Sequence, residues 1–311
     1  MSSTCGLAAV TGGAGFLGQH VVRTLADAGW RVRVLARREP TSLFWDGLAP
    51  EVVRGDLFDS ATLDRLCAGA DLIVHVAGQI GGGKRDLDRV NIEGARNLAT
   101  AAAATKAHLL QVSSLAAREP QLSPYAASKR GGEAVAQELL GDRLTIVRPP
   151  AIYGPGDRET LRLFKLAAAS PVLPVLDPRA KLALVHAEDA ARQIVALGES
   201  ALPGVAVLSD SRPEGYDWRE IMQTAAAAFE RRPRLVRIPS LTLYAMAFLD
   251  EFANNWRPRA SVLTFGKVNE LTYLDWGVRP NERATSAPMP KYDLLSGFRQ
   301  TIGWYRSQGW L

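Results

Sequence analysis

One glycine-rich segment constrains the fold of this chain more than any other feature. The segment reads Thr11-Gly-Gly-Ala-Gly-Phe-Leu-Gly18, and it follows a short apolar run at 7–10 and opens a helical pattern at 16–28. Glycines three residues apart at such a junction permit a tight turn, close approach of the backbone to a pyrophosphate and close packing of helix on strand. A helix that starts there also presents free amides and the positive end of its dipole to phosphates. The sequence therefore predicts a dinucleotide-binding turn, with contacts from Gly12, Gly15, Phe16, Leu17 and Gly18.

Short apolar runs and helical patterns alternate through the first half of the chain. The expected strands span residues 7–10, 31–36, 51–54, 72–76, 108–113 and 145–148. Helical patterns lie between them at 16–28, 61–68, 87–104 and 125–140. Most of the strands are apolar throughout, as strands buried on both faces are. Repeated strand–helix–strand units predict an α/β fold with a doubly wound parallel sheet, the Rossmann architecture.

The pattern changes after Pro149-Pro150. Prolines become frequent, helices are expected to start near Arg158, Ala187 and Asp217, and an amphipathic helix is expected at 292–308. We therefore expect a nucleotide-binding domain at 1–157, to which the chain returns at about 181–210. Residues 158–311 are expected to form a smaller, irregular region that mostly binds substrate.

Composition argues against several other classes of protein. No run approaches the ~20 apolar residues of a membrane span, and no basic stretch precedes an apolar one at the amino terminus, which predicts a cytoplasmic protein. Cys5 and Cys67 are too few for a disulfide framework, and both lie in patterns that predict burial. The net charge of +5 is scattered along the chain, so we expect an anionic cofactor or substrate and no nucleic acid as partner. No metal site is predicted.

The residues after the expected second strand bear on the choice of cofactor. An enzyme that uses NAD usually has an acid there, which accepts hydrogen bonds from the ribose hydroxyls. Here Ala36 is followed by Arg37 and Arg38. Guanidinium groups suit a 2′-phosphate through charge and a bidentate fork. The sequence thus favours NADP over NAD, and the alternative is a pair of solvated surface arginines.

Two further strand ends offer contacts for the cofactor. Asp56 and Leu57 follow the third strand, where the carboxylate can accept a hydrogen bond from the adenine amino group. His75 lies in the fourth strand, and the small residues Ala77 and Gly78 after it leave room for the cofactor. His75 itself is expected to pack within the sheet.

The candidate reactive groups follow the fifth strand. Ser113-Ser114 ends that strand, and Tyr125-Ala-Ala-Ser-Lys129 opens the next helix. The i, i+4 spacing places the phenol and the ammonium group on one helix face. A cation beside a phenol lowers the pKa of the phenol, which can then exchange a proton closer to neutral pH. A serine hydroxyl opposite can orient a substrate oxygen and stabilise the charge that develops there.

Together these motifs resemble the extended short-chain dehydrogenase/reductase family, also known as the NAD-dependent epimerase/dehydratase family. Besides the segments above, the resemblance includes Val90-Asn91 with Gly94, Arg148-Pro-Pro-Ala-Ile-Tyr-Gly-Pro-Gly156 and Leu184-Val-His-Ala-Glu-Asp189. It runs from Thr11 to about Asp189 and is far less clear over the rest of the chain.

The resemblance implies roles for the reactive residues. Ser114 would hold the substrate oxygen, Tyr125 would be the acid/base, and Lys129 would hold the nicotinamide ribose and tune the tyrosine. Pro149 would lie beside the nicotinamide. The supporting residues implied in the same way are Asn91, which serves the fold and a water chain, and His186 and Asp189, which hold the second region to the first.

Several reactions are known on such a fold. A 4,6-dehydratase carries an Asp-Glu pair where this chain has Leu115-Ala116, which argues against dehydration. Pro149-Pro150 resembles the hydroxysteroid dehydrogenases and dihydroflavonol-reductase-like members rather than the epimerases. We therefore expect an NADP-dependent oxidoreductase that interconverts a ketone and a secondary alcohol by hydride transfer. The alternatives are a nucleotide-sugar epimerase with bound NAD and a non-catalytic assembly factor, although such factors typically lose the Tyr-Lys pair.

A late apolar stretch bears on the substrate. Residues 241–249, with Phe252 and Trp256, form an apolar helical pattern without the arginines and asparagines that suit a nucleotide diphosphate. A pocket walled in this way favours a bulky hydrophobic ketone, such as a steroid-like or long-chain lipid molecule. The alternative is that these residues pack the small domain or a homodimer interface.

Overall fold

The computed structural model describes residues 5–40, 42–256, 264–283 and 286–311, apart from the side chains of Cys5 and of residues 251–256. The expected burial of Cys5 and the expected contribution of Phe252 and Trp256 lie outside these described side chains. The chain forms two compact units. The first contains Met1–Pro149, Ala190–Leu208 and Ala284–Pro288, and the second contains Pro150–Asp189, Ser209–Arg283 and Met289–Leu311.

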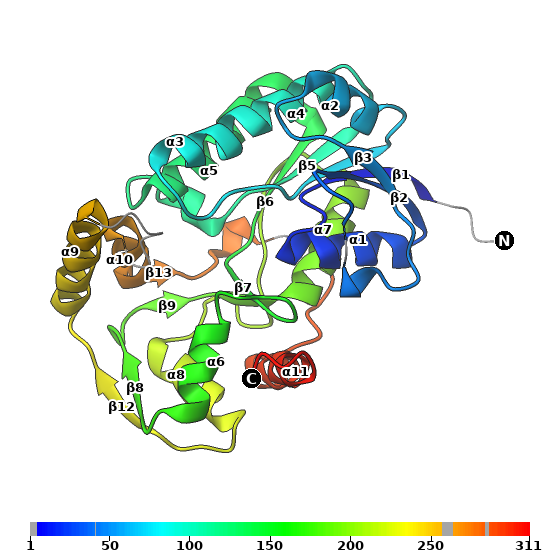
Figure 1. Cartoon of the computed structure of the whole chain (residues 1–311). Coiled ribbons are helices and arrows are strands. Elements are labelled where there is room, and N and C mark those ends of the chain that lie inside the picture. The colour runs from blue at the N-terminus through cyan, green and yellow to red at the C-terminus, as the bar shows by residue number, and fades with distance from the viewer. Residues whose placement is uncertain (1–4, 41, 257–263, 284–285) are drawn as a thin grey trace. The chain divides into compact units, whose positions relative to one another are not determined.

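A seven-stranded sheet in the order β11-β6-β5-β4-β1-β2-β3 forms the centre of the first unit (Figure 1). All neighbouring strands pair in parallel, so the predicted doubly wound sheet is confirmed. The order of the strands reverses between β1 and β4, which is where such sheets open a crevice at their carboxyl ends. The strands are β1 (Cys5–Thr11), β2 (Trp30–Ala36), β3 (Glu51–Arg54), β4 (Leu72–His75), β5 (His108–Val112), β6 (Leu144–Arg148) and β11 (Gly204–Val207).

Helices cover both faces of this sheet (Figure 1). On one face, α2 (Ser60–Cys67), α4 (Gly94–Ala103) and α5 (Pro124–Leu140) pack on strand residues such as Leu109. On the other face lie α1 (Phe16–Asp27) and the part of α7 (Ala187–Ser200) that belongs to the first unit. There the Cα of Gly198 approaches Leu72 and Leu110 closely, so that an added Cβ would lie 3.0 Å from Leu72 Cδ2. The core therefore lies in two layers, one on each side of the sheet.

A continuous helical stretch covers the helix expected at 87–104, but it is not α-helical throughout. It consists of α3 (Lys84–Asp88), a π-helical turn (Arg89–Glu93) and then α4. The turn contains Asn91, whose Nδ2 donates to Gln79 O and Ser128 Oγ, both at 2.9 Å. Gly132 of α5 packs directly on Asn91 O, because a Cβ at 132 would collide with that oxygen. These tertiary contacts hold the wider turn, as is common for π-turns at functional sites.

The second unit is built from short parallel strand pairs and helices, with an aromatic core that includes the fully buried Tyr153, Phe164, Phe298 and Tyr305. Its strand pairs are β7 (Ala151–Tyr153) with β10 (Leu184–His186), β8 (Val172–Val175) with β12 (Arg234–Arg237), and β9 (Lys181–Leu182) with β13 (Asp275–Trp276). Its helices are α6 (Leu161–Ala169), α8 (Trp218–Ala227), α9 (Ser240–Trp256), α10 (Phe265–Thr272) and α11 (Leu294–Ser307). Short 3₁₀ turns lie at Leu43–Trp45, Leu115–Arg118, Gly141–Arg143 and Pro280–Glu282.

The boundary between the units has a structural cause. Residues 151–157, which the sequence places in the first domain, lie in the second unit, because β7 pairs with β10 instead of the central sheet. The helix expected near Arg158 begins at Leu161. The buried Asp157 carboxylate accepts hydrogen bonds from the amides of Glu159 (2.8 Å) and Thr160 (3.0 Å), so these residues form a turn ahead of the helix.

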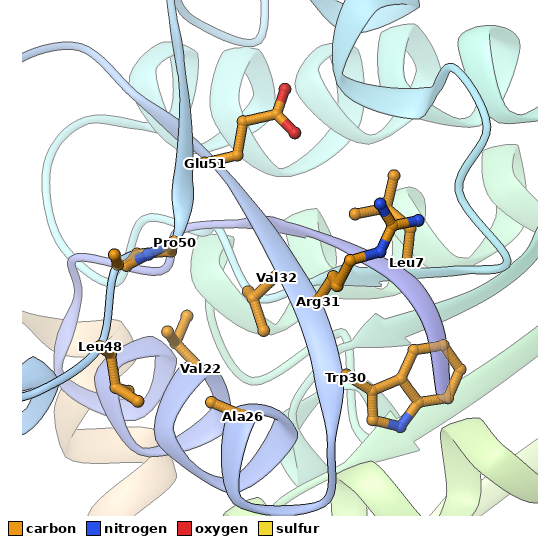
Figure 2. A pocket seen from close by; sticks show the side chains of 10 residues that line it. Leu7, Val22, Ala26, Trp30, Arg31, Val32, Leu48, Pro50 and Glu51 are labelled. Carbon is orange, nitrogen blue, oxygen red and sulfur yellow. The ribbon is translucent and has the colours of Figure 1, made fainter. Parts of the chain in front are cut away.

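A hollow of about 320 Å³ lies at the amino ends of β1, β2 and β3, lined by Leu7, Trp30, Val32, Pro50 and Glu51 among others (Figure 2). The glycine turn lies at the opposite, carboxyl ends of these strands, so this hollow is separate from the predicted site. Cys67 and His75 are buried, as expected. Within the described part of the chain, no helix is both long enough and apolar enough to cross a membrane.

Candidate active site

The glycine turn between β1 and α1 has no room for side chains at two positions. Gly12 has a positive φ of 72°, and a Cβ there would lie 2.5 Å from Ala77 N. A Cβ at Gly18 would collide with Gly12 O. The turn is closed by the amide of Gly15, which donates to Gly12 O at 2.9 Å. The backbone of the turn is therefore held against the segment after β4, and any larger residue at 12 or 18 would force them apart.

The amino end of α1 is open to an anion. Gly15 is the N-cap residue, it supplies no side-chain hydrogen bond, and no acidic residue lies in the first turn. The amide groups of Phe16 and Leu17 belong to this turn, where helix amides lack intrahelical acceptors. A pyrophosphate fits such an end through hydrogen bonds and the helix dipole.

The predicted contacts after β2 and β3 lie at the surface. Arg37 and Arg38 are exposed, and in the described part of the chain neither forms an ion pair. Asp56 is also exposed, and its Oδ1 accepts a hydrogen bond from Phe58 N at 2.8 Å. Leu57 is buried against Gly94, where an added Cβ would lie 2.9 Å from Leu57 Cδ1. Leu57 can therefore offer its backbone but not its side chain to a cofactor.

Gly78 lies between the segment predicted to contact the cofactor and the predicted reactive residue Lys129. A Cβ at this position would lie 3.3 Å from both Lys129 Nζ and Asn91 Oδ1. The same Asn91 oxygen accepts from Gln79 N at 2.9 Å, which fixes the backbone directly after Gly78. Ala77 precedes it, beside the glycine turn. The structure thus brings the predicted Ala77, Gly78 and Lys129 together with Asn91.

Lys129 is buried at the end of β5. Its ammonium group donates to Val112 O at 2.9 Å. Burial lowers the pKa of Lys129 to about 8, and the charge of Glu133 one helical turn later partly offsets that effect. An amine with such a pKa is poised to share or move a proton near neutral pH.

His75 adjoins this group and is held neutral. Burial, followed by the charge of Lys129, lowers the pKa of His75 to about 3. Its Nδ1 lies 2.6 Å from Thr11 Oγ1 across the β1–β4 pair. The neutral ring therefore holds Thr11, the first residue of the glycine-rich segment, in place. This agrees with the expected packing of His75 within the sheet.

Helix α5 positions Tyr125 one turn before Lys129. The helix begins at Pro124, and Ser123 caps it by accepting from Ala126 N at 2.9 Å. Tyr125 is half-buried and therefore accessible, whereas Lys129 is buried. A proline in the first turn and a serine cap are typical of helix starts. The local sequence therefore fixes where α5 begins, and with it the positions of Tyr125 and Lys129 on the helix.

The two serines after β5 differ in their surroundings. Ser114 is half-buried, and its Oγ accepts from Ala116 N at 3.2 Å, which leaves its hydroxyl proton available. Ser113 is buried, and its Oγ has no hydrogen-bond partner among the described residues. Pro149 is buried at the end of β6, and its carbonyl accepts from Leu115 N at 2.8 Å. Accessibility therefore supports Ser114 as the serine that could meet a substrate.

A buried ion pair supports α5, and sequence reasoning missed it. Arg148 at the end of β6 forms a two-point contact with Glu133, at 2.8 Å from Nε and 2.6 Å from Nη2. Glu133 is 2% exposed and Arg148 7%. Glu133 lies one helical turn beyond Lys129, on the same helix face. An acid at that spacing was the sequence signal that could have indicated a charged contact there.

The expected supporting pair His186 and Asp189 lies in the second unit. His186 Nε2 lies 3.0 Å from Gln300 Oε1. The Asp189 carboxylate accepts from the amides of Lys291 and Tyr292 at 2.9 to 3.0 Å. These bonds tie the segment before α11 to the start of α7 within this unit.

The residues present fit a nicotinamide dinucleotide. The glycine turn leaves a cradle that a Cβ would fill, the helix end above it is uncapped, and small residues follow β4. Lys129 would lie beside the reactive end, and Asp56 beyond β3 would lie toward the adenine end. Among the described residues, no group of three or more His, Cys, Asp or Glu side chains could hold a metal ion.

Comparisons with known proteins agree with this geometry. The NAD dependent epimerase/dehydratase family matches residues 8–206. A ceramide reductase from Caulobacter vibrioides is 48% identical over 307 residues, which cover 98% of this chain and 96% of that protein. A 2-alkyl-3-oxoalkanoate reductase from Stenotrophomonas maltophilia is 28% identical over 250 residues, covering 70% of this chain and 74% of that protein.

Solved structures support the fold alone, because their identities are low. Gox2253 has a TM-score of 0.78 at 23% identity, covering 97% of this chain and 98% of that one. MoeE5, solved with UDP-glucuronic acid and NAD, has a TM-score of 0.72 at 20% identity, covering 97% and 99%. The chain therefore belongs to the NAD-dependent epimerase/dehydratase family, the extended short-chain dehydrogenases/reductases, and is an oxidoreductase that uses a nicotinamide cofactor.

Proposed function

We propose that this enzyme uses NADPH to reduce a ketone to a secondary alcohol on a lipid of the ceramide type. The observation that carries the proposal is the 48% identity to a ceramide reductase over nearly the whole of both chains. A ceramide carries a secondary hydroxyl on its long-chain base, and the corresponding ketone is a bulky apolar substrate. The match includes the last part of this chain, where the resemblance of motifs is weakest.

The reactive residues have complementary roles in this reaction. The reduced nicotinamide, when bound, supplies hydride to the carbonyl carbon. Tyr125 donates its phenol proton to the carbonyl oxygen as negative charge develops there. Ser114 donates a hydrogen bond to the same oxygen and orients it. Lys129, buried with a pKa of about 8, stabilises the phenolate that remains.

The residues of this chain favour a reductase over the other activities of the family. Leu115-Ala116 stands where a dehydratase needs an acidic pair, and Pro149-Pro150 stands where an epimerase often has asparagine. Tyr125 and Lys129 are both present, whereas non-catalytic assembly factors typically lose this pair. These features favour a hydride transfer that leaves the substrate reduced. They do not favour the epimerase reaction, in which a sugar would rotate in the site and take the hydride back.

The proposed substrate class can be tested by following NADPH oxidation. With a 3-oxoceramide dispersed in detergent micelles, we expect steady oxidation of NADPH and formation of the ceramide. UDP-glucose and dTDP-glucose should neither be consumed nor raise the unfolding temperature, because a site for an apolar ceramide-type ketone does not need charged groups that bind a diphosphate. Stabilisation by a nucleotide sugar, together with no response to oxoceramide, would contradict the proposal and favour an epimerase.

The choice of NADP over NAD rests on Arg37 and Arg38, which are exposed at the end of β2. Titration should show NADPH binding at least about tenfold more tightly than NADH, a difference of about 1.4 kcal/mol. Arg37→Ala should weaken NADPH selectively, because the loss of a guanidinium matters only to the 2′-phosphate.

Arg31→Ala is the matched control for this prediction. Arg31 is an exposed arginine at the amino end of the same strand, away from the glycine turn. Equal affinities for NADPH and NADH that neither substitution changes would show that the arginines do not select the cofactor.

A further inference from the structure

Helix α9 exposes large apolar side chains along one face. Leu241 is 77% exposed, Met246 53% and Leu249 63%. Leu241 and Phe248 are seven residues apart, about two turns, so they lie on one stripe of the helix, and Leu249 lies beside this stripe on the same broad face. Residues 240–249 contain no charged side chain. Phe248 itself is 60% exposed.

The opposite face of α9 is packed within the second unit. Ala247 is fully buried. Tyr244 donates its hydroxyl proton to Asn269 Oδ1 of α10 at 2.9 Å, and its ring stacks on Phe265 with centroids 6.4 Å apart. The packed face anchors the helix, so the exposed face is held in place as a defined apolar surface.

Basic side chains precede this helix. Arg232, Arg234 and Arg237 are exposed, and Arg237 lies three residues before the first residue of α9. In the described part of the chain, Arg232 and Arg234 form no ion pair. Arg237 contacts Asp177 at 3.5 Å, and that carboxylate also binds Arg179 at 2.8 Å. The neighbourhood of β12 therefore carries net positive charge.

We propose that the exposed face of α9, together with Arg232 and the arginines of β12, docks the enzyme on the surface of an anionic lipid bilayer. An apolar helix face gains free energy when it enters the boundary between headgroups and acyl chains. Adjacent arginines add attraction to anionic headgroups. The surface has both elements, whereas apolar residues scattered singly would not suggest a partner. If the proposed lipid substrate is correct, docking places the enzyme where that substrate resides.

A bilayer fits this surface better than a second copy of the chain. Symmetric pairing would bring the same patch of each copy together. A second copy would need an acidic surface opposite these arginines, and residues 240–249 of its own exposed face carry no acid. An anionic lipid surface complements the charge that a second copy would repeat.

The proposal is tested by flotation with vesicles, in the absence of substrate and cofactor. Vesicles of phosphatidylcholine with about 30% phosphatidylglycerol should carry the full-length protein, and pure phosphatidylcholine should carry much less. The double variant Leu241→Glu/Leu249→Glu should lower binding by about tenfold or more, because it puts two charges on the inserting face. Arg232→Glu/Arg234→Glu should also lower binding to the anionic vesicles.

Leu202→Glu is the matched control, since Leu202 is 59% exposed on the other unit and should be silent. Thermal unfolding checks that each variant is folded, and turnover of oxoceramide in micelles is measured separately. Docking without turnover would count against the proposed substrate only. Failure of the wild type to float, equal flotation of the Leu241/Leu249 variant, or a dimer that this variant dissociates would overturn the docking proposal.

Discussion

Replacing Tyr125 with phenylalanine is expected to lower the turnover of a ketone substrate by about 100-fold or more. The substitution removes the proton donor and keeps the shape of the ring. Tyr125 is half-buried at the start of α5, one helical turn from the buried Lys129. Cofactor affinity should barely change, because the ring is retained. Steady-state rates and cofactor titration on the same preparation measure both quantities.

Two variants sharpen this test. Lys129→Met should reduce both turnover and cofactor affinity, since this lysine would contact the ribose and stabilise the phenolate. Tyr292→Phe also removes a half-buried phenol hydroxyl, one that donates to Glu188 Oε2 at 2.9 Å in the second unit, and it should leave turnover near that of the wild type. Near-full activity of the Tyr125 variant on a confirmed substrate would remove this residue from the mechanism.

Glu133→Ala is expected to lower the free energy of unfolding by about 3–5 kcal/mol, the usual cost of breaking a buried ion pair from one side. The Arg148 guanidinium would lose both contacts to the carboxylate while it remains 7% exposed. The change also removes the charge that raises the pKa of Lys129, so this pKa should fall further. Chemical denaturation measures the loss of stability.

The matched control is Glu138→Ala, which removes an exposed carboxylate from the same helix. Substitutions at such surface positions usually change stability by less than about 0.5 kcal/mol. A Glu133 variant as stable as the Glu138 variant would mean that the buried pair contributes little to holding α5 against β6.

The central sheet could be predicted from the sequence because its strands are apolar on both faces. Apolar segments such as 72–76 are stable only when they are buried in a core. The helices that connect these segments allow only a few orders of strands in the sheet. The edge strand β11 could not be predicted, because it is not apolar on both faces. Val205 is 48% exposed and the strand has only four residues, so it lacks the continuous apolar pattern of a central strand.

The π-turn around Asn91 could not be predicted from local pattern. It depends on hydrogen bonds to Gln79 and Ser128 and on the close approach of Gly132, which lie 12 to 41 residues away in the sequence. Propensity and periodicity describe only neighbouring residues, and tertiary contacts outweighed them here. The start of α6 shows the same limit at shorter range, because the side chain of Asp157 turns the backbone before the helix can begin.

Some features of the candidate site could also be predicted from the sequence, and others could not. The glycine turn was predictable because backbone geometry demands particular residues there, and the structure gives the reason in the collisions at Gly12 and Gly18. The pKa of Lys129 was not predictable, because it depends mainly on burial, which only the fold creates. The assignment of Ser114, Tyr125 and Lys129 as catalytic residues stays a prediction.

The two parts of the cofactor site have different capacities for evolutionary change. A substitution at Gly18 is blocked by the oxygen of Gly12, so a lineage can alter this position only by rebuilding the turn. Arg37 and Arg38 are exposed and form no ion pair in the described part of the chain, so the fold does not resist their replacement. Under the proposed role of Arg37 and Arg38, selection could exchange one nicotinamide cofactor for the other through surface mutations at these two positions, at almost no loss of stability, while the glycine turn stays unchanged.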